Sequence, residues 1–188
     1  MTNNPIEGIA GARGSESDHS SPTTGLRRYL GFSTDHKVIG IQYLVTSFIF
    51  FLIAGLLSMI IRGELITPPL DLVDRPVYNG LFTIHGTMMI FLWIIPTQVG
   101  LANYLIPLMI GARDMAFPVL NGIAFWIIPP AGILLLSSFL LPSGTAQAGW
   151  WSYPPVSIQN PSGHLINGEL IWVLSVALLG ISSIMGGG

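Results

Sequence analysis

The sequence predicts an all-α fold, a polytopic bundle of four membrane-spanning helices, on three observations. Only 9% of the 188 residues are charged and 51% are hydrophobic, whereas about 25% of residues are charged in an average soluble domain. Four long apolar runs follow a polar amino-terminal stretch. These runs lack the alternation over about 10 residues that marks membrane β-barrel strands. Helices are therefore the spanning structure that satisfies the backbone hydrogen bonds.

The apolar runs predict the bounds of the helices. They cover residues 38–61, 79–110, 119–141 and 170–186. A helix needs about 20 apolar residues to cross the hydrocarbon core, so the first three runs are long enough and the fourth is slightly short. The runs contain Pro96, Pro107, Pro129 and Pro130. These prolines predict kinks, whose freed carbonyls are satisfied by neighbouring helices.

The distribution of polar and charged residues predicts the domain limits and the orientation. Residues 1–30 are rich in Ser, Gly, Asn and Thr, so we expect a disordered cytoplasmic tail there and a transmembrane domain over residues 31–188. Basic residues gather in the short loops on the cytoplasmic side of a membrane. On the side of the amino terminus lie Arg13, Arg27, Arg28, Lys37 and Arg113, against Arg62 and Arg75 on the opposite side. The amino terminus is therefore predicted to be cytoplasmic.

Composition also excludes several classes of function. The chain has no cysteine, which excludes disulfide frameworks and thiolate metal sites. Its 7 Lys and Arg residues form no basic patch that could neutralise phosphates, so we expect no nucleic-acid partner.

His85 is the one histidine within the four predicted helices. It lies about six residues, or roughly 9 Å, into the second helix from its outer end. An ionisable side chain at this depth is a candidate for function, such as ligation of a haem iron with the second ring nitrogen oriented by a backbone carbonyl. Gly86 leaves room beside it for a flat macrocycle. The alternative is a neutral histidine that is hydrogen-bonded between helices.

Further polar residues lie toward the predicted cytoplasmic end. Asn103 follows His85 by about five helical turns and is expected on the same face of the helix. The others are Asp114 in the following loop, Asn121 at the start of the third helix, Tyr43 in the first helix, and Ser182 and Ser183 in the fourth. Such side chains can hold a file of water with a carboxylate at its mouth. The alternative is ordinary hydrogen bonding between helices, with Asn121 as a helix N-cap.

Two pairs of residues at the opposite, outer end also allow two interpretations. Arg62 and Glu64 end the first helix and are expected to snorkel to the interface, although a guanidinium can also donate to a cofactor carbonyl or formyl group. Trp150 and Tyr153 lie in the long outer loop, where aromatic rings form either an interfacial belt or a cap over a cofactor.

Five stretches together resemble subunit I of the haem–copper oxidases, the catalytic subunit of cytochrome c oxidase. They are residues 33–40 (STDHKVIG), 61–65 (IRGEL), 81–91 (LFTIHGTMMIF), 103–121 (NYLIPLMIGARDMAFPVLN) and 149–155 (GWWSYPP). The resemblance runs from about Gly31 to Met185. It implies the first four of twelve membrane helices, in a bacterial plasma membrane or another energy-transducing membrane.

The resemblance implies a role for each candidate residue. His85 matches an axial ligand of a low-spin haem, haem A, and Arg62 matches the arginine bonded to its formyl group.

Asp114 matches the entrance of a proton channel, with His36 nearby. Asn103, Asn121, Tyr43, Ser182 and Ser183 match residues that line the channel. Glu64 matches a residue of a calcium or sodium site, and Trp150 and Tyr153 match aromatics above the haems.

The implied parent enzyme transfers electrons from cytochrome c to oxygen, forms water and pumps protons. Its second haem and copper lie beyond residue 188 in the family, so the chain alone is expected to have no oxygen-reducing activity. The implied partners are the remaining helices of subunit I, subunits II and III, cytochrome c and the lipid membrane. Two alternatives remain open: a quinol oxidase subunit I, and a non-catalytic four-helix membrane protein.

Overall fold

The computed structural model describes residues 25–66, 72–158 and 163–186. Regular structure in these residues is helical, with one isolated β-bridge between Thr145 and Gly168. Most of the expected tail, residues 1–24, lies outside the described residues. Residues 25–30 of the expected tail are described, and Arg27–Leu30 forms a short helix there, α1.

Four helical segments are long and apolar enough to cross a membrane, which confirms the predicted architecture. They are α2 (His36–Glu64), α3 (Arg75–Met88) continued by η1 (Met89–Ile94) and α4 (Ile95–Ile110), α5 (Pro118–Ser137) continued by η2 (Ser138–Leu140), and α6 (Gly168–Gly186). A short turn of helix, η3 (Val156–Ile158), lies in the loop before α6.

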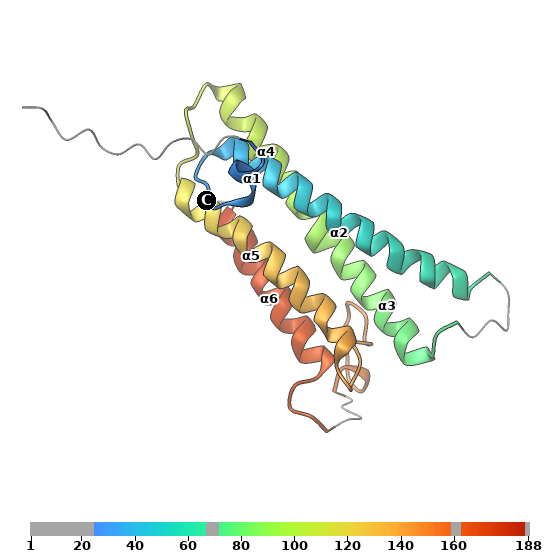
Figure 1. The fold of residues 1–188 in the computed structure, drawn as a ribbon. Helices are drawn as coiled ribbons and strands as arrows, with labels where there is room; N and C mark the ends of the chain where they lie inside the picture. Colours follow the sequence, from blue (N-terminus) through green and yellow to red (C-terminus); the bar gives the residue numbers. More distant parts are fainter. Residues whose placement is uncertain (1–24, 67–71, 159–162, 187–188) are drawn as a thin grey trace, which may run out of the picture.

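The helices form two antiparallel pairs that lie side by side (Figure 1). The chain of α3, η1 and α4 runs along α2, and α5 runs along α6. We call the end that holds α1 and the start of α5 the inner end, because the basic residues predict that it faces the cytoplasm. The opposite end, where α2 meets α3 and α5 meets α6, is the outer end.

The second span contains a π-helical segment directly before Pro96. Across η1, the N–H of Ile95 donates to the carbonyl of Ile90, five residues earlier. Pro96 follows at once and has no N–H to donate. The wider turn therefore accommodates the proline without ending the helix. Pro107 and the pair Pro129 and Pro130 lie within continuous α-helix.

Glycines allow α2 and α4 to approach closely near the inner end. A Cβ atom on Gly40 would lie 2.9 Å from the carbonyl oxygen of Gly100, and a Cβ on Gly100 would lie 3.0 Å from that of Gly40. Small residues at a crossing let two helix backbones meet without side chains between them. This crossing fixes the two helices beside the polar residues of the inner end.

Candidate functional site

His85 has a defined tautomer at the outer half of the bundle. Its Nδ1 lies 2.9 Å from the carbonyl oxygen of Ala54 on α2. A carbonyl only accepts, so Nδ1 carries a proton, and in the neutral imidazole Nε2 then keeps the lone pair. Within the described residues Nε2 has no hydrogen-bond partner. The Ala54 carbonyl is the kind of partner expected both for an oriented haem ligand and for a histidine hydrogen-bonded between helices.

The surroundings of His85 fit a haem. A Cβ atom on Gly86 would meet no atom within 4 Å, so the helix presents open space next to the imidazole. A neutral imidazole with one nitrogen held by a carbonyl and the other free is the form that binds a metal. Among the described residues, no three His, Asp or Glu side chains gather as they would around a free metal ion.

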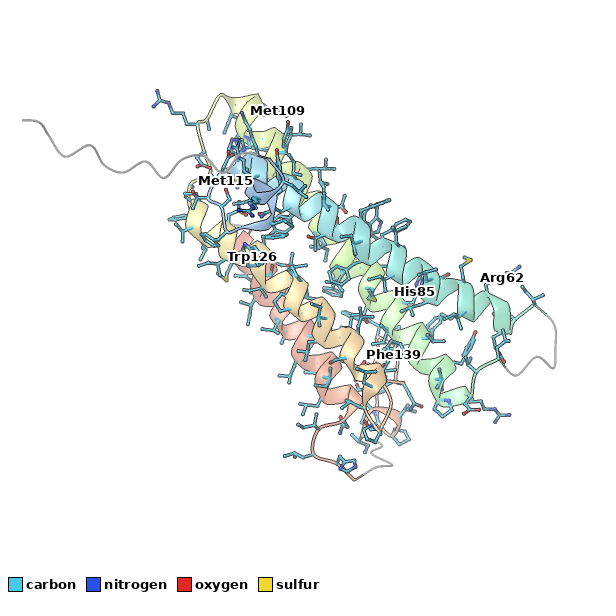
Figure 2. All side chains as sticks on the ribbon, in the orientation of Figure 1. Arg62, His85, Met109, Met115, Trp126 and Phe139 are labelled. Carbon is cyan, nitrogen blue, oxygen red and sulfur yellow. The ribbon has the colours of Figure 1, made fainter. Side chains whose placement is uncertain are left out.

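Two candidate residues end α2 at the outer end. Arg62 is exposed and lies in the same half of the bundle as His85 (Figure 2). Glu64 accepts hydrogen bonds at Oε2 from the backbone N–H groups of Leu72 (2.8 Å) and Val73 (3.3 Å). The Glu64 carboxylate therefore ties the end of α2 to the chain that leads into α3.

An aromatic cluster joins the outer loop to the helix of His85. The Trp150 ring stacks on Phe91 at 5.0 Å between centroids and meets the edge of Trp172 at 5.8 Å. Tyr153 stacks on Trp151 at 6.3 Å and is exposed. Of the two predicted outer-loop aromatics, Trp150 is therefore the one that packs on the helices.

Two threonines that flank His85 bind this loop and α6 through hydrogen bonds. Trp172 Nε1 donates to Thr87 Oγ1 at 2.9 Å, and the N–H of Gly149 donates to Thr83 Oγ1 at 3.0 Å. Sequence reasoning missed both threonines and Trp172. The available signal was a pair of hydroxyl side chains four residues apart, on either side of the histidine in an apolar helix.

At the inner end three helices meet through buried polar side chains. Asn103 Nδ2 on α4 donates to Asn121 Oδ1 on α5 at 3.0 Å. His36 Nδ1 on α2 donates to the carbonyl oxygen of Asn103, also at 3.0 Å. All three residues are buried, and Asn121 Nδ2 has no partner among the described residues. The structure thus brings together three residues predicted to lie along a proton path.

One expectation about these asparagines is wrong. Asn121 is not a helix N-cap, because α5 begins at Pro118 after Phe117, and the Asn121 side chain points to Asn103. The Asn103 side chain reaches α5, and its carbonyl, like the His85 imidazole, contacts α2. The π turns of η1 lie between them and break the α-helical register that the spacing assumed.

Tyr43, Ser182 and Ser183 line one small cavity between the two helix pairs. Ser182 Oγ donates to the carbonyl of Ala124 at 2.7 Å. The Tyr43 ring meets the edge of Phe125 at 5.2 Å and is buried. Tyr43 lies on α2 and both serines lie on α6, so the predicted lining residues reach the same cavity from two helices.

Asp114 lies outside this buried group. It is exposed in the loop between α4 and α5, where Oδ1 accepts from the N–H of Met115 at 2.8 Å. A cavity of about 390 Å³ is lined in part by Met115, the residue after Asp114, and by Asn103 and Gly186. The Asp114 carboxylate is thus exposed, whereas Asn103, Asn121 and Tyr43 are buried.

The sequence model of one family, described as Cytochrome C and Quinol oxidase polypeptide I, matches residues 38–188. The chain is 58% identical over 158 residues to cytochrome c oxidase subunit 1 of Synechocystis sp., covering 84% of this chain and 28% of that protein. It is 56% identical over 159 residues to that of Thermostichus vulcanus, with the same coverage. For Corynebacterium glutamicum the identity is 45% over 152 residues, covering 81% of this chain and 26% of the relative.

The chain spans about 28% of the length of the first two relatives. The family match covers the four spanning helices except the first two residues of α2. The relatives are bacterial and the described helices suit a bilayer, as expected for a multi-pass integral membrane protein. The chain belongs to the cytochrome c and quinol oxidase polypeptide I family, the subunit I of haem–copper oxidases.

Proposed function

We propose that this chain forms part of the catalytic subunit of a terminal respiratory oxidase and provides an axial ligand to a low-spin haem, haem A, through His85. The observation that carries the proposal is the bond from His85 Nδ1 to the carbonyl of Ala54, which leaves Nε2 for the iron. Open space at Gly86 and the nearby Trp150 cluster support the same location. When bound, the haem supplies one-electron redox chemistry.

The residues of this chain would hold and tune the group. The Ala54 carbonyl fixes the imidazole plane and raises the basicity of the ligating nitrogen. Arg62, at the outer end of the neighbouring helix, would donate to the formyl group, and Trp150 would exclude water on the outer side. For Glu64, a calcium or sodium site stays a prediction.

A second part of the proposal concerns protons. Asp114 would collect protons at the inner surface, and His36, Asn103 and Asn121 would pass them through water toward Tyr43, Ser182 and Ser183. The close contacts from His36 to Asn121 support this path. With the haem ligand toward the outer end and the carboxylate at the inner end, electrons and protons would approach from opposite sides, which would separate charge across the membrane.

The test of the haem proposal is His85→Ala in the complete oxidase. We expect loss of the low-spin haem absorption, because no other histidine in the described bundle replaces this nitrogen. His36→Ala is the matched control: it removes a histidine at the inner end and should leave that absorption unchanged. An intact low-spin haem spectrum in the His85 variant would overturn the assignment.

We propose cytochrome c as the electron donor and subunits II and III with the remaining helices of subunit I as partners. The relatives named above are cytochrome c oxidases, which favours this donor over a quinol. Turnover of the complete enzyme with reduced cytochrome c, compared with a reduced quinol, distinguishes the two. Membership of the oxidase family favours either over a non-catalytic four-helix protein.

A further inference from the structure

Residues 25–35, which we call the inner segment, fold across the inner end of the bundle. The side-chain amide of Gln42 on α2 donates from Nε2 to the carbonyls of Tyr29 (3.0 Å) and Gly31 (2.8 Å). On the other side the segment touches α5, since a Cβ atom on Gly122 would lie 2.8 Å from the carbonyl oxygen of Ser33. The inner segment thus bridges α2 and α5 where α5 carries Asn121.

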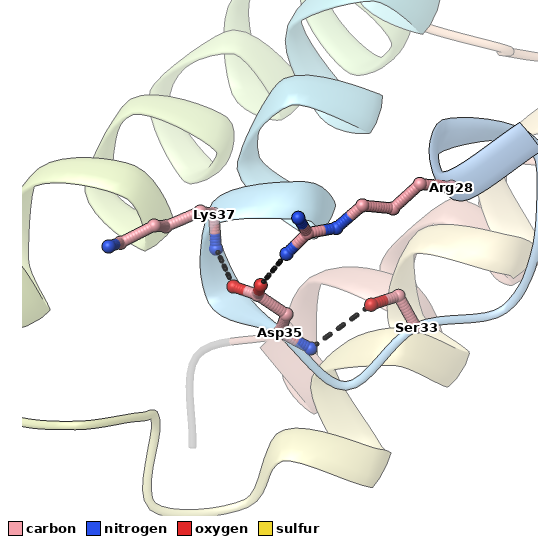
Figure 3. A network of polar contacts seen from close by, with 4 residues as sticks. All are labelled: Arg28, Ser33, Asp35 and Lys37. Carbon is pink, nitrogen blue, oxygen red and sulfur yellow. Dashed lines mark hydrogen bonds and ion pairs between the residues drawn. The ribbon is translucent and has the colours of Figure 1, made fainter. Parts of the chain in front are cut away.

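An ion pair holds the two ends of this segment together (Figure 3). Arg28 Nη2 donates to Asp35 Oδ2 at 2.6 Å. The other carboxylate oxygen, Oδ1, accepts from the N–H of Lys37 at 2.9 Å and so caps α2. The Asp35 N–H in turn donates to Ser33 Oγ at 3.2 Å. One carboxylate therefore joins α1 to the first turn of α2.

The residue after Asp35 is His36, whose imidazole donates to the carbonyl of Asn103. His36 is 4% exposed although it is the first residue of its helix. A side chain in the first turn of a helix depends on the cap for its direction, because that turn lacks the backbone bonds of the helix interior. The direction of His36 therefore depends on how Asp35 is held.

From these contacts we propose that Arg28 and Asp35 are positioning residues, whose ion pair clamps the inner segment and keeps the His36 imidazole on Asn103. The inference rests on the proposed function where it assigns His36 and Asn103 to the proton path. An isolated exposed ion pair contributes little to stability. This pair acts instead on the direction of the His36 side chain, because the Asp35 carboxylate also caps the helix that begins with His36.

The test uses the complete oxidase with four variants that separate the ion pair from the cap and from surface charge. Arg28→Gln breaks the pair. Asp35→Asn also breaks it but keeps a side chain that caps helices well. Arg28→Lys keeps the charge. Arg27→Gln is the matched control, because it removes the same charge from the same turn, and Arg27 forms no ion pair within the described residues.

Two measurements are made on each variant: the rate at which diethyl pyrocarbonate modifies His36, followed by mass spectrometry, and the rate of proton uptake. We expect Arg28→Gln and Asp35→Asn to raise His36 modification and to slow proton uptake about two- to fivefold. A double variant that combines Arg28→Gln with Asp35→Asn should match either single variant, because each of the two substitutions removes the same interaction. Arg28→Lys and Arg27→Gln should stay near the wild type.

The outcomes separate this inference from the proposed function. If His36 stays as protected in Arg28→Gln and Asp35→Asn as in Arg27→Gln, the clamp does not position it and the inference is overturned. If His36 becomes reactive while proton uptake is unchanged, the clamp is supported and the assignment of His36 to the proton path fails. The low-spin haem spectrum checks that each variant has assembled.

Discussion

At the scale of single residues, the polar side chains of this bundle are directed by backbone carbonyls. His85 donates to Ala54, His36 to Asn103, and Ser182 to Ala124. In an apolar surrounding, a polar group without a partner is costly. Each of these contacts satisfies the buried donor and at the same time fixes its orientation, which a functional side chain requires.

Trp172 gives a first prediction at this scale. Trp172→Phe removes the donor to Thr87 but keeps an aromatic ring against Trp150. We expect a loss of about 1 kcal/mol in the free energy of unfolding, measured by denaturation of the complete subunit. Trp126→Phe, which changes a partly exposed ring packed edge-on against Phe125, is the control and should cost less. Equal losses would contradict a role for the Thr87 bond.

Asp35 gives a prediction about pH. Burial alone would raise the pKa of Asp35, but the Lys37 N–H and the Arg28 guanidinium outweigh it and lower the pKa below its usual value. A carboxylate with a lowered pKa stabilises the fold above its unfolded pKa of about 3.9, and this contribution is lost as the pH falls through the folded pKa. The difference in Tm between wild type and Asp35→Asn should therefore be full near neutral pH and vanish in acid. A difference that persists in strong acid would count against this ion pair.

At the scale of helices, close approach depends on particular glycines. The crossing of α2 and α4 at Gly40 and Gly100 leaves no room for a methyl group. The π turns of η1 change the rotation of the second span part of the way along. Both halves of that span pack along α2, where His85 contacts Ala54 and the Asn103 carbonyl contacts His36. The Asn103 side chain also reaches Asn121 on α5.

Gly100→Ala tests the crossing. The added Cβ would lie 2.8 Å from Tyr43 Cβ and 3.0 Å from the Gly40 carbonyl, so the helices must separate. We expect a loss of about 1–3 kcal/mol in the free energy of unfolding. Gly55→Ala on α2 is the matched control, since its Cβ would meet nothing within 4 Å and alanine favours helix by about 0.5–1 kcal/mol. Similar effects from both would disprove a tight crossing.

At the scale of the whole molecule, the residues proposed to hold the haem and those proposed to conduct protons lie in different halves of the bundle. The His85 imidazole and the Trp150 cluster occupy the outer half, and the polar series from Asp114 to Ser183 occupies the inner half. The apolar helices between them keep charges out of the hydrocarbon region. Substitutions in one half of the bundle should therefore leave the residues of the other half, and the property measured there, unchanged.

Asp114→Asn tests this separation. In the complete oxidase, removal of the carboxylate should slow turnover by about tenfold or more, because an amide cannot exchange protons with water as a carboxylate does. The haem spectra should not change. Asp74→Asn, which removes a carboxylate at the outer end before α3, should leave turnover nearly unchanged. Normal turnover in the Asp114 variant would exclude it as the entrance.

The sequence by itself determined the number of spans, their approximate limits and the position of the one histidine within them, His85. Hydropathy and length are properties of consecutive residues, so they can be taken from the sequence directly. Only the tertiary structure decided that Ala54 orients His85, that Asn121 pairs with Asn103 rather than capping α5, and that Trp172 binds Thr87. Each of these depends on the rotation and height of one helix against another. Those quantities are set by packing at glycines and by the π turns of η1, and no local pattern of residues encodes them.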